Sequence, residues 1–467
     1  MIRATLCTAW LLLAAGSLFA QASADARRAL EREILGELIE VNTSDSARGT
    51  PALAAKIVTR LLAGGFDRRD VVVTGFDSTL ANVVVRYRGR ETGKKPILLM
   101  AHLDVVDARR EDWSFDPYRF REEGGFYYGR GTSDNKAGVA TLLANFLRLK
   151  AEGYRPDRDL IMVLTADEET TGASIKWLVE ERRSLVDAEY ALNTDGGGGA
   201  LKDGAPQAFG VQASEKMYLT YLLEIRNKGG HSSIPVADNA IYRLSKGLAR
   251  LADFEFPVRL NEVSRASFLA TAETERGAAA DDLRALATRN DPAAARRVAA
   301  RSPYFNAEMR TTCVATRLFA GHADNALPQL ATATVNCRIL PDASPDEVRT
   351  TLASVIADTG IAIREAAPPT PSPPSPLRPD VLEPITRLVA KRWPGAPVIP
   401  EMSTGATDGL YVRNAGIPVY GVSALFEDID DIRAHGRDER VGVASFHDAV
   451  SSWYEMLKAL TKGEGAA

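Results

Sequence analysis

The sequence predicts an α/β protein that is interrupted by an inserted α+β module, and three observations predict this fold class. Helical and strand-like segments alternate from residue 96 to residue 193, as in sheets with helical crossovers. The run Pro96–Ala101 is apolar on both faces, which is typical of a central parallel strand. After about Ala213 the alternation stops, and strands followed by a helix-rich stretch indicate a second module.

The first part of the chain has the periodicity of an α/β sheet with its helices. Amphipathic helices are expected at 28–41 and 51–64, and β-rich runs follow at 71–87 and 96–106. A helix, a strand, a second helix and a second strand are then expected at 137–150, 159–165, 173–183 and 188–193. Ligands of such sheets gather beyond the carboxyl ends of the strands, so polar residues there are the first candidates for a site.

The second part reads as an insertion. It begins with a strand at 217–225 and a helix at 239–250, continues through an Ala- and Arg-rich helical stretch, and ends with two strands and a helix at 344–359. The Pro-rich stretch 368–379 closes it as a stiff connector, after which a helix at 381–393 and a strand at 419–422 resume the first domain. The expected domains are 25–213 and 380–467 for the first, and 214–367 for the insertion, whose helical part is 260–310.

Two cysteines lie in the strand-like runs of this insertion. A hairpin folded about Asn325 would place Cys313 and Cys337 opposite each other. In an oxidising compartment they could form a disulfide, and two buried free thiols are the alternative.

Length and composition narrow the class of protein. At 467 residues the chain exceeds the size at which single cores usually stop growing, so two domains are expected. The hydrophobic fraction of 45% and the charged fraction of 25% are those of an ordinary globular protein. The net charge is -4 and there is no basic block, which speaks against a nucleic-acid partner.

The N-terminus has the pattern of a signal peptide. Arg3 precedes the apolar run Leu6–Ala20, and Ala22-Ser23-Ala24 is a small-residue cleavage site. The alternative is an uncleaved anchor, but the apolar run is short for a membrane span. Cleavage near Ala24, export to a periplasm and no stable membrane insertion are therefore expected.

Histidines and acids stand mostly at the ends of the predicted strands. They are His102 with Asp104 two residues later, Asp134 in a Gly-containing segment before a helix, Asp167-Glu168-Glu169, Asp195 before four glycines, and His435. Two histidines and three acids from this set could hold a pair of divalent metal ions. For His102 alone, a buried structural histidine would be the alternative, but the acid at i+2 and the partner motifs argue against it.

These motifs resemble those of the M20 family of co-catalytic zinc hydrolases. The matching runs, in the family's order, are HLDVV at His102, GRGTSDNKAG around Asp134, TADEETTGA around Glu168, NTDGG around Asp195, KGGHSS around His231 and AHGRDERV around His435. The resemblance implies a zinc-exopeptidase-like catalytic domain with a mixed, mostly parallel sheet. A lid or dimerisation domain would interrupt it, and the helical stretch 260–310 resembles an insertion found in some members only.

The resemblance also implies a role for each ligand. Asp134 would bridge two divalent ions, which are expected to be Zn²⁺, with Co²⁺ or Mn²⁺ as alternatives. His102 and Asp195 would hold one ion, and Glu169 and His435 the other. Asp104 would orient the metal-bound imidazole.

Two further residues are expected to act on the reacting bond. Glu168, directly before the ligand Glu169, would be the general base, although an acid cluster at a helix N-terminus is also favourable for the helix alone. His231 would stabilise the tetrahedral oxyanion, from the neighbouring subunit in dimeric relatives. A packing role at the end of a strand is the alternative for His231.

Substrate recognition is expected from the inserted module and from a Gly-containing loop. Arg338 would bind a substrate carboxylate with Asn325 as its polar partner, and Gly405 would line the site; a salt bridge within the lid is the alternative role for Arg338. Many relatives have Arg two residues after Asp408, but here Leu410 stands there, which puts a desuccinylase-like specificity in doubt. The family tends to have Asp at position 195 in peptidases and Glu in deacylases.

Together these features predict a secreted di-zinc exopeptidase that cleaves a peptide or related amide bond beside a free carboxylate. An N-acyl-amino-acid amidohydrolase with the same metals is the first alternative. A non-catalytic binding protein on the same fold is the second. The expected partners are a small peptide or acyl-amino-acid substrate and, through the lid domain, a second copy of the chain.

Overall fold

The computed structural model describes residues 24–462, which form two compact units. The first unit contains the chain up to Phe209, Pro379–Ala396 and the chain from Gly421 onward, and the second contains Gly210–Arg378 and Pro397–Tyr420. The segment Pro397–Tyr420 thus groups with the second unit, whereas the sequence analysis placed it in the first domain. The predicted signal peptide, 1–24, lies outside the described residues except for its last alanine.

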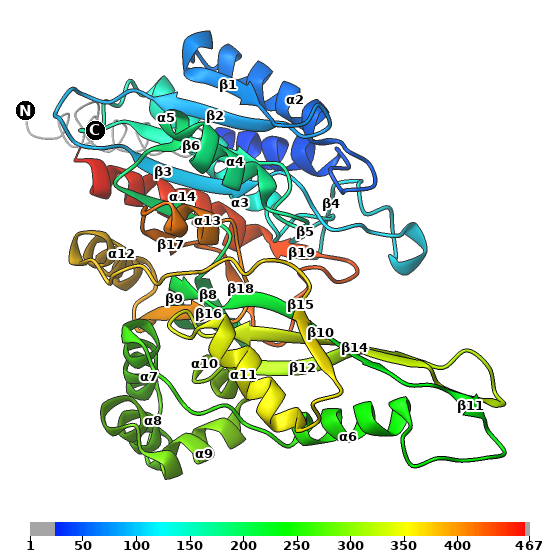
Figure 1. Cartoon of the computed structure of the whole chain (residues 1–467). Helices are drawn as coiled ribbons and strands as arrows, with labels where there is room; N and C mark the ends of the chain where they lie inside the picture. Colours follow the sequence, from blue (N-terminus) through cyan, green and yellow to red (C-terminus); the bar gives the residue numbers. More distant parts are fainter. Residues whose placement is uncertain (1–23, 463–467) are drawn as a thin grey trace, which may run out of the picture. The chain divides into compact units, whose positions relative to one another are not determined.

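The first unit is an α/β structure built on a large mixed sheet, which confirms the predicted fold class (Figure 1). Five neighbouring strands of this sheet have the order β1 (Val71–Thr74), β2 (Asn82–Tyr87), β6 (Leu160–Thr165), β3 (Ile97–His102) and β7 (Tyr190–Asn193). Strand β3 runs parallel to both of its neighbours. All six of its residues are buried, as predicted for a central strand.

Helices accompany these strands, and periodicity predicted all of them except the short α5 (Arg183–Val186) and the C-terminal α14 (Val443–Thr461). Residues 24–39 are helical, and the further helices are α2 (Thr50–Ala63), α3 (Lys136–Ala151), α4 (Ala173–Glu181), α5 (Arg183–Val186), α12 (Pro379–Arg392) and α14 (Val443–Thr461). The C-terminal helix α14, red in Figure 1, packs beside α3. There the Asn145 side chain donates a hydrogen bond to the Val450 carbonyl at 3.0 Å.

Several short strands were not predicted. They are β4 (Arg121–Glu123), β5 (Phe126–Tyr128), β8 (Gly198–Lys202), β18 (Phe426–Asp428) and β19 (Arg440–Gly442), and the longer β9 (Ala205–Glu215) and β16 (Val398–Ser403) were missed as well. A strand of three to five residues shows too few alternations to be recognised by periodicity. Strand β17 (Val419–Gly421) falls within the predicted strand at 419–422.

The second unit contains a four-stranded sheet with the order β12 (Thr312–Ala320), β14 (Leu330–Ile339), β10 (Met217–Arg226) and β15 (Ala362–Glu365). Along β10, buried residues alternate with less buried ones, so one face of the sheet carries the apolar core. Helices α6 (Ala240–Ala252) and α11 (Pro345–Ile356) contribute Leu244, Leu251, Val348 and Leu352 to that core.

The helical stretch of the insertion has a core of its own. It consists of α7 (Glu262–Thr274), α8 (Ala278–Arg289), α9 (Pro292–Arg301) and α10 (Pro303–Glu308). Phe268, Leu286 and Val298 are buried together in it. The short helix α13 (Gly409–Asn414) belongs to the same unit.

The two cysteines of this unit form a disulfide, which decides between the two alternatives that the sequence left open. Cys313 and Cys337 are directly opposite each other in the antiparallel pair β12–β14.

The Pro-rich stretch between α11 and α12 is partly packed rather than solvated, since Ser375 is buried and its hydroxyl donates a hydrogen bond to the Val419 carbonyl.

Over residues 24–462, no helix has the length and apolar character that a crossing of the bilayer requires.

Candidate metal centre

The register of the central strands brings three predicted ligand segments to one edge of the sheet. His102, the last residue of β3, is paired with Thr165 at the end of β6, so Glu168 and Glu169 follow at the same edge. On the other side Met100 is paired with Asn193, which places Asp195 level with His102. Because strands β6 and β7 both run parallel to β3, their register brings the three segments to the same edge of the sheet.

Asp134 lies between the two histidines. Its Oδ1 is 2.9 Å from Nε2 of His102, and its Oδ2 is 3.0 Å from Nε2 of His435. His435 Nε2 is also 3.0 Å from a carboxylate oxygen of Glu169. One carboxylate thus faces two separate imidazoles through its two oxygens.

The side chains form three groups whose candidate ligand atoms lie within 4.8 Å of one another. They are His102, Asp134 and Asp195; Asp134, Glu169 and His435; and His102, Glu168 and Glu169. Asp134 is shared by the first two groups, and these two together contain the five predicted ligands. Glu168 enters only the third group.

Asp104 makes more contacts than the sequence predicted. His102 Nδ1 is 3.0 Å from its backbone carbonyl and 3.5 Å from its carboxylate. The carboxylate oxygens accept hydrogen bonds from the backbone N–H groups of Glu168 and Glu169, at 3.1 and 2.9 Å. A single residue therefore orients the imidazole and also fixes the backbone of the two glutamates.

The carboxylates of the cluster favour the protonated form of both histidines. Burial opposes protonation of His102, but hydrogen bonds with Asp104 and Asp134 outweigh it and hold the pKa of the imidazole well above its ordinary value. Hydrogen bonds with Asp134 and Glu169 raise the pKa of His435 to about 10. Burial likewise opposes ionisation of Asp134, yet the hydrogen bonds with both histidines lower its pKa.

The donor set fits a pair of divalent ions. Imidazole nitrogen and carboxylate oxygen are the ligands that Zn²⁺ takes in catalytic sites. The clustered carboxylates of Asp134, Glu168, Glu169 and Asp195 carry negative charge that two divalent cations would neutralise. The two oxygens of Asp134 face different histidines, as a bridging ligand requires.

The remaining predicted residues belong to the second unit. His231 ends β11 (Gly230–His231), which pairs with β13 (Ala326–Leu327), and its Nδ1 is 2.7 Å from the Ser233 hydroxyl. The backbone N–H of Ser232 donates to the Asn325 carbonyl at 3.0 Å. The structure therefore brings His231 and Asn325 together, although they are far apart in the sequence.

Arg338 lies in β14 between Tyr218 of β10 and Thr312 of β12. Its guanidinium stacks over the Tyr218 ring, 4.7 Å from the centroid. In the described part of the chain no acid forms an ion pair with it, and burial lowers its pKa. This arrangement argues against the alternative of a salt bridge within the unit.

Gly405 belongs to a loop whose backbone is hydrogen-bonded to the Glu215 side chain. The Gly405 N–H donates to the Ser403 hydroxyl at 3.0 Å. Glu215, which is fully buried, accepts the Thr407 N–H at 3.1 Å and pairs with Arg413.

The sequence analysis missed the pair Arg130–Glu439, whose side chains contact the backbone of Asp134 and His435. The two side chains are 2.6 Å apart and almost fully buried. Both lie inside motifs that were recognised, GRGTSDNK and AHGRDERV. The motifs indicate Asp134 and His435 as ligands, whereas no periodic pattern marks a buried ion pair.

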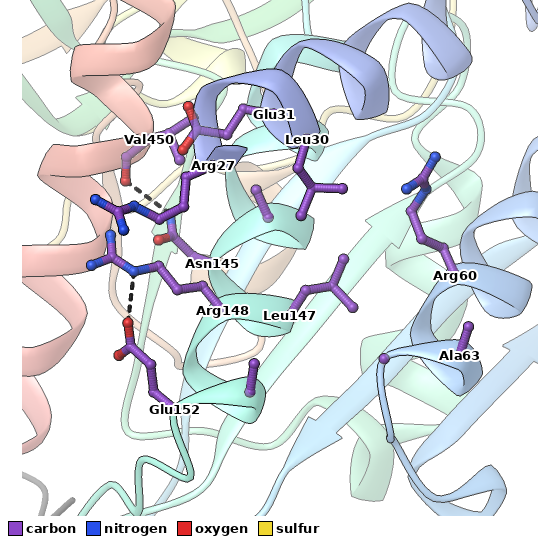
Figure 2. A pocket seen from close by; sticks show the side chains of 13 residues that line it. Arg27, Leu30, Glu31, Arg60, Ala63, Asn145, Leu147, Arg148, Glu152 and Val450 are labelled. Atoms are coloured by element: carbon purple, nitrogen blue, oxygen red, sulfur yellow. Dashed lines mark hydrogen bonds and ion pairs between the residues drawn. The ribbon is translucent and has the colours of Figure 1, made fainter. Parts of the chain in front are cut away.

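A cavity of about 510 Å³ in the first unit contains none of the candidate ligands (Figure 2). Its walls are partly apolar, with Leu30 and Leu147, and its charged groups have partners within the chain. Figure 2 shows Arg148 pointing to Glu152, and Arg60 pairs with Glu33 and Glu37. Apolar walls and paired charges do not indicate a reaction centre in this cavity.

The chain is similar in sequence to known proteins. The profile of "Peptidase family M20/M25/M40" matches residues 98–459. The human protein "N-fatty-acyl-amino acid synthase/hydrolase PM20D1" is 28% identical over 385 residues, which cover 79% of this chain and 75% of that protein. A "Probable carboxypeptidase S-like 2" from Dictyostelium discoideum is 26% identical over 398 residues, covering 82% and 75%.

Solved structures share the fold. The "M20 family metallo-carboxypeptidase Sso-CP2" from Sulfolobus solfataricus superposes with a TM-score of 0.70 at 19% identity, covering 92% of this chain and 99% of that one. At this identity the similarity concerns the fold.

Proposed function

The chain belongs to peptidase family M20/M25/M40 and is a hydrolase of that family, and we propose that it is a di-zinc exopeptidase acting beside a free carboxylate. The observation that carries the proposal is the geometry of Asp134, whose two oxygens each face one of two histidines. That arrangement suits a bridging ligand in a site that hydrolyses an amide bond.

The side chains around the ions would have separate roles in hydrolysis of the amide bond. When bound, two divalent ions supply Lewis-acid activation of a water molecule and of the substrate carbonyl. Glu168 accepts the proton of the attacking water and later gives it to the leaving amine. Asp104 holds the Glu168 backbone N–H, which fixes where the side chain leaves the main chain. We assign His231 to the developing oxyanion, as the family resemblance implies.

Arg338 supports the requirement for a free carboxylate. A half-buried guanidinium without an acid partner in the described chain is a suitable receptor for an anionic group. Its stacking on Tyr218 holds the planar fork in place. We propose that the substrate's terminal carboxylate binds there.

Hydrolysis of N-acyl amino acids is the second candidate. It is favoured by the printed name of the human relative, an N-fatty-acyl-amino acid synthase/hydrolase. Such a substrate also carries an amide beside a free carboxylate, so the same residues would serve it. Asp rather than Glu at position 195 favours peptides.

Matched substrates distinguish the two candidates. We expect the purified, zinc-loaded protein to cleave a dipeptide with a higher kcat/KM than the N-acetyl form of the same C-terminal residue. Amidation of the dipeptide's carboxylate should lower kcat/KM by about 10–100-fold, because the charge-assisted contact with Arg338 is lost. Faster cleavage of the N-acyl substrate would favour the second candidate. No hydrolysis of either class by metal-loaded protein would support a binding protein instead.

We further propose that the second unit acts as a lid and that it joins two copies of the chain. Strand β12 is an edge of its sheet, is largely exposed, and carries the exposed apolar residues Val314, Leu318 and Phe319. A long exposed apolar edge strand is a template for pairing with another chain. A second copy can pair there antiparallel and extend the sheet.

Substitution of edge residues of β12 by lysine tests the proposed dimer. The double variant Leu318→Lys, Phe319→Lys is expected to shift a dimer to monomer in sedimentation equilibrium, because charge blocks edge pairing. Ile432→Lys, at an equally exposed apolar residue of the first unit, is the control and should stay dimeric. A wild-type chain that is monomeric at all concentrations, or a double variant that still dimerises, would contradict the proposal.

Export is proposed from the signal-peptide pattern before Ala24. N-terminal sequencing of the protein recovered outside the cytoplasm should begin near Asp25. A chain that retains its first residues and stays in the cytoplasm would contradict it.

A further inference from the structure

A buried ion pair connects the two loops that carry Asp134 and His435. Arg130 and Glu439 are 2.6 Å apart, and their side chains are 3% and 0% exposed. Removing two charges from water costs several kcal/mol, so such a pair is weak support for stability and needs another reason. The hydrogen bonds that each side chain makes to the two loops supply that reason.

Strand pairing explains why the two loops meet. Strands β5 and β19 are antiparallel, with Tyr128 opposite Arg440. Asp134 follows shortly after β5, and Glu439 comes directly before β19. The Gly129 N–H continues the ladder by donating to the Glu439 carbonyl at 3.1 Å.

The Glu439 carboxylate holds the backbone that leads into Asp134. Its Oε1 accepts the N–H groups of Ser133 and Asp134, at 2.8 and 3.1 Å. Its Oε2 accepts the Gly131 N–H at 3.1 Å as well as the Arg130 guanidinium. Three backbone contacts within four residues leave this loop little freedom, so the position of the Asp134 carboxylate depends on Glu439.

The Arg130 guanidinium holds the other loop. It donates to the carbonyls of Gly436 at 3.0 Å and His435 at 3.4 Å, and it stacks over the Trp113 ring. His435 has a positive φ of 61°, a left-handed conformation that is uncommon outside glycine. Such a conformation persists only where the surroundings enforce it, and Arg130 supplies two of those contacts.

We infer that Glu439 and Arg130 are positioning residues that fix the bridging carboxylate Asp134 and the imidazole of His435 relative to each other. Neither side chain is a candidate ligand. The pair acts through the backbone of both ligand loops, so it would set how far apart the Asp134 carboxylate and the His435 imidazole lie. The inference rests on the proposed metal centre.

Glu439→Gln tests it with the least change of shape. The amide keeps one acceptor oxygen but loses the charge and replaces the second acceptor with a donor, which faces N–H groups. We expect Zn²⁺ affinity, measured by competition with a chromophoric chelator, to fall on the order of 10–100-fold. Arg130→Lys, which keeps the charge but not the fork, should fall in the same direction. Asp157→Asn is the control, since it removes a buried carboxylate that pairs with Lys94 in the same unit.

Circular dichroism and the Tm are recorded for every variant, so that lost affinity is separated from lost fold. Reduced affinity in Glu439→Gln and Arg130→Lys, with wild-type affinity in Asp157→Asn, supports the inference. Wild-type affinity in Glu439→Gln, or an equal loss in the control, overturns it alone. A wild-type chain that binds no zinc overturns the proposed metal centre as well.

Discussion

Replacing Glu168 by alanine is expected to lower kcat on the order of 10²–10⁴-fold, the usual contribution of a general base, or more if water activation fails with it. The carboxylate lies in one group with His102 and Glu169, so it can reach a water molecule held at the metal site. Metal content should stay near that of the wild type, because the other two groups contain every proposed ligand without Glu168.

Steady-state kinetics and elemental analysis together check this prediction. Glu168→Gln should behave like the alanine variant, because an amide cannot accept the proton. Glu180→Ala removes an exposed acid further along in α4 and should keep full activity. Retention of most activity by Glu168→Ala, or loss of both metals from it, would refute the assignment.

The Asp134→Ala variant is expected to lose most of its bound metal and its activity. Its carboxylate is shared by two ligand groups, and without it two imidazoles lose their common partner. Breaking a shared ligand weakens both ions, whereas Asp195 enters only one group. Asp195→Ala should therefore retain more metal than Asp134→Ala.

Metal stoichiometry after dialysis, measured by elemental analysis, distinguishes these variants. His102→Ala should also lower the stoichiometry. Two ions per chain in Asp134→Ala would contradict the bridging role, and an equal loss in both aspartate variants would show that Asp134 has no special position. The expected loss of activity should accompany the loss of metal in each case.

Periodicity predicted many of the long elements, although it missed β9 and α14, and the motifs indicated the family. The apolar run 96–101 predicted the central strand, and β3 is buried throughout. The predicted helix at 137–150 is α3, and the strand at 217–225 is β10. These elements are long enough for a repeating pattern to build up, and their burial follows directly from that pattern.

Local sequence was also sufficient to propose three of the ligands, because His102, Glu169 and Asp195 lie at the ends of predicted strands. That they meet depends on register, which pairs His102 with Thr165 and Met100 with Asn193. Order along the chain suggests a shared edge, but only hydrogen-bonded pairing sets the level of each residue on it.

Tertiary structure alone decided the parts that depend on distant contacts. Short strands such as β5 and β19 are defined by each other, and their pairing brings Glu439 to the loop of Asp134. The predicted hairpin placed Cys313 opposite Cys337 but left open whether the two thiols are bonded, and the structure shows the disulfide. Asp104 proved to hold the Glu168–Glu169 backbone as well as His102. The physical reason is that three-dimensional proximity, rather than local pattern, sets the partner of each group, and a buried polar group is stable only with such a partner.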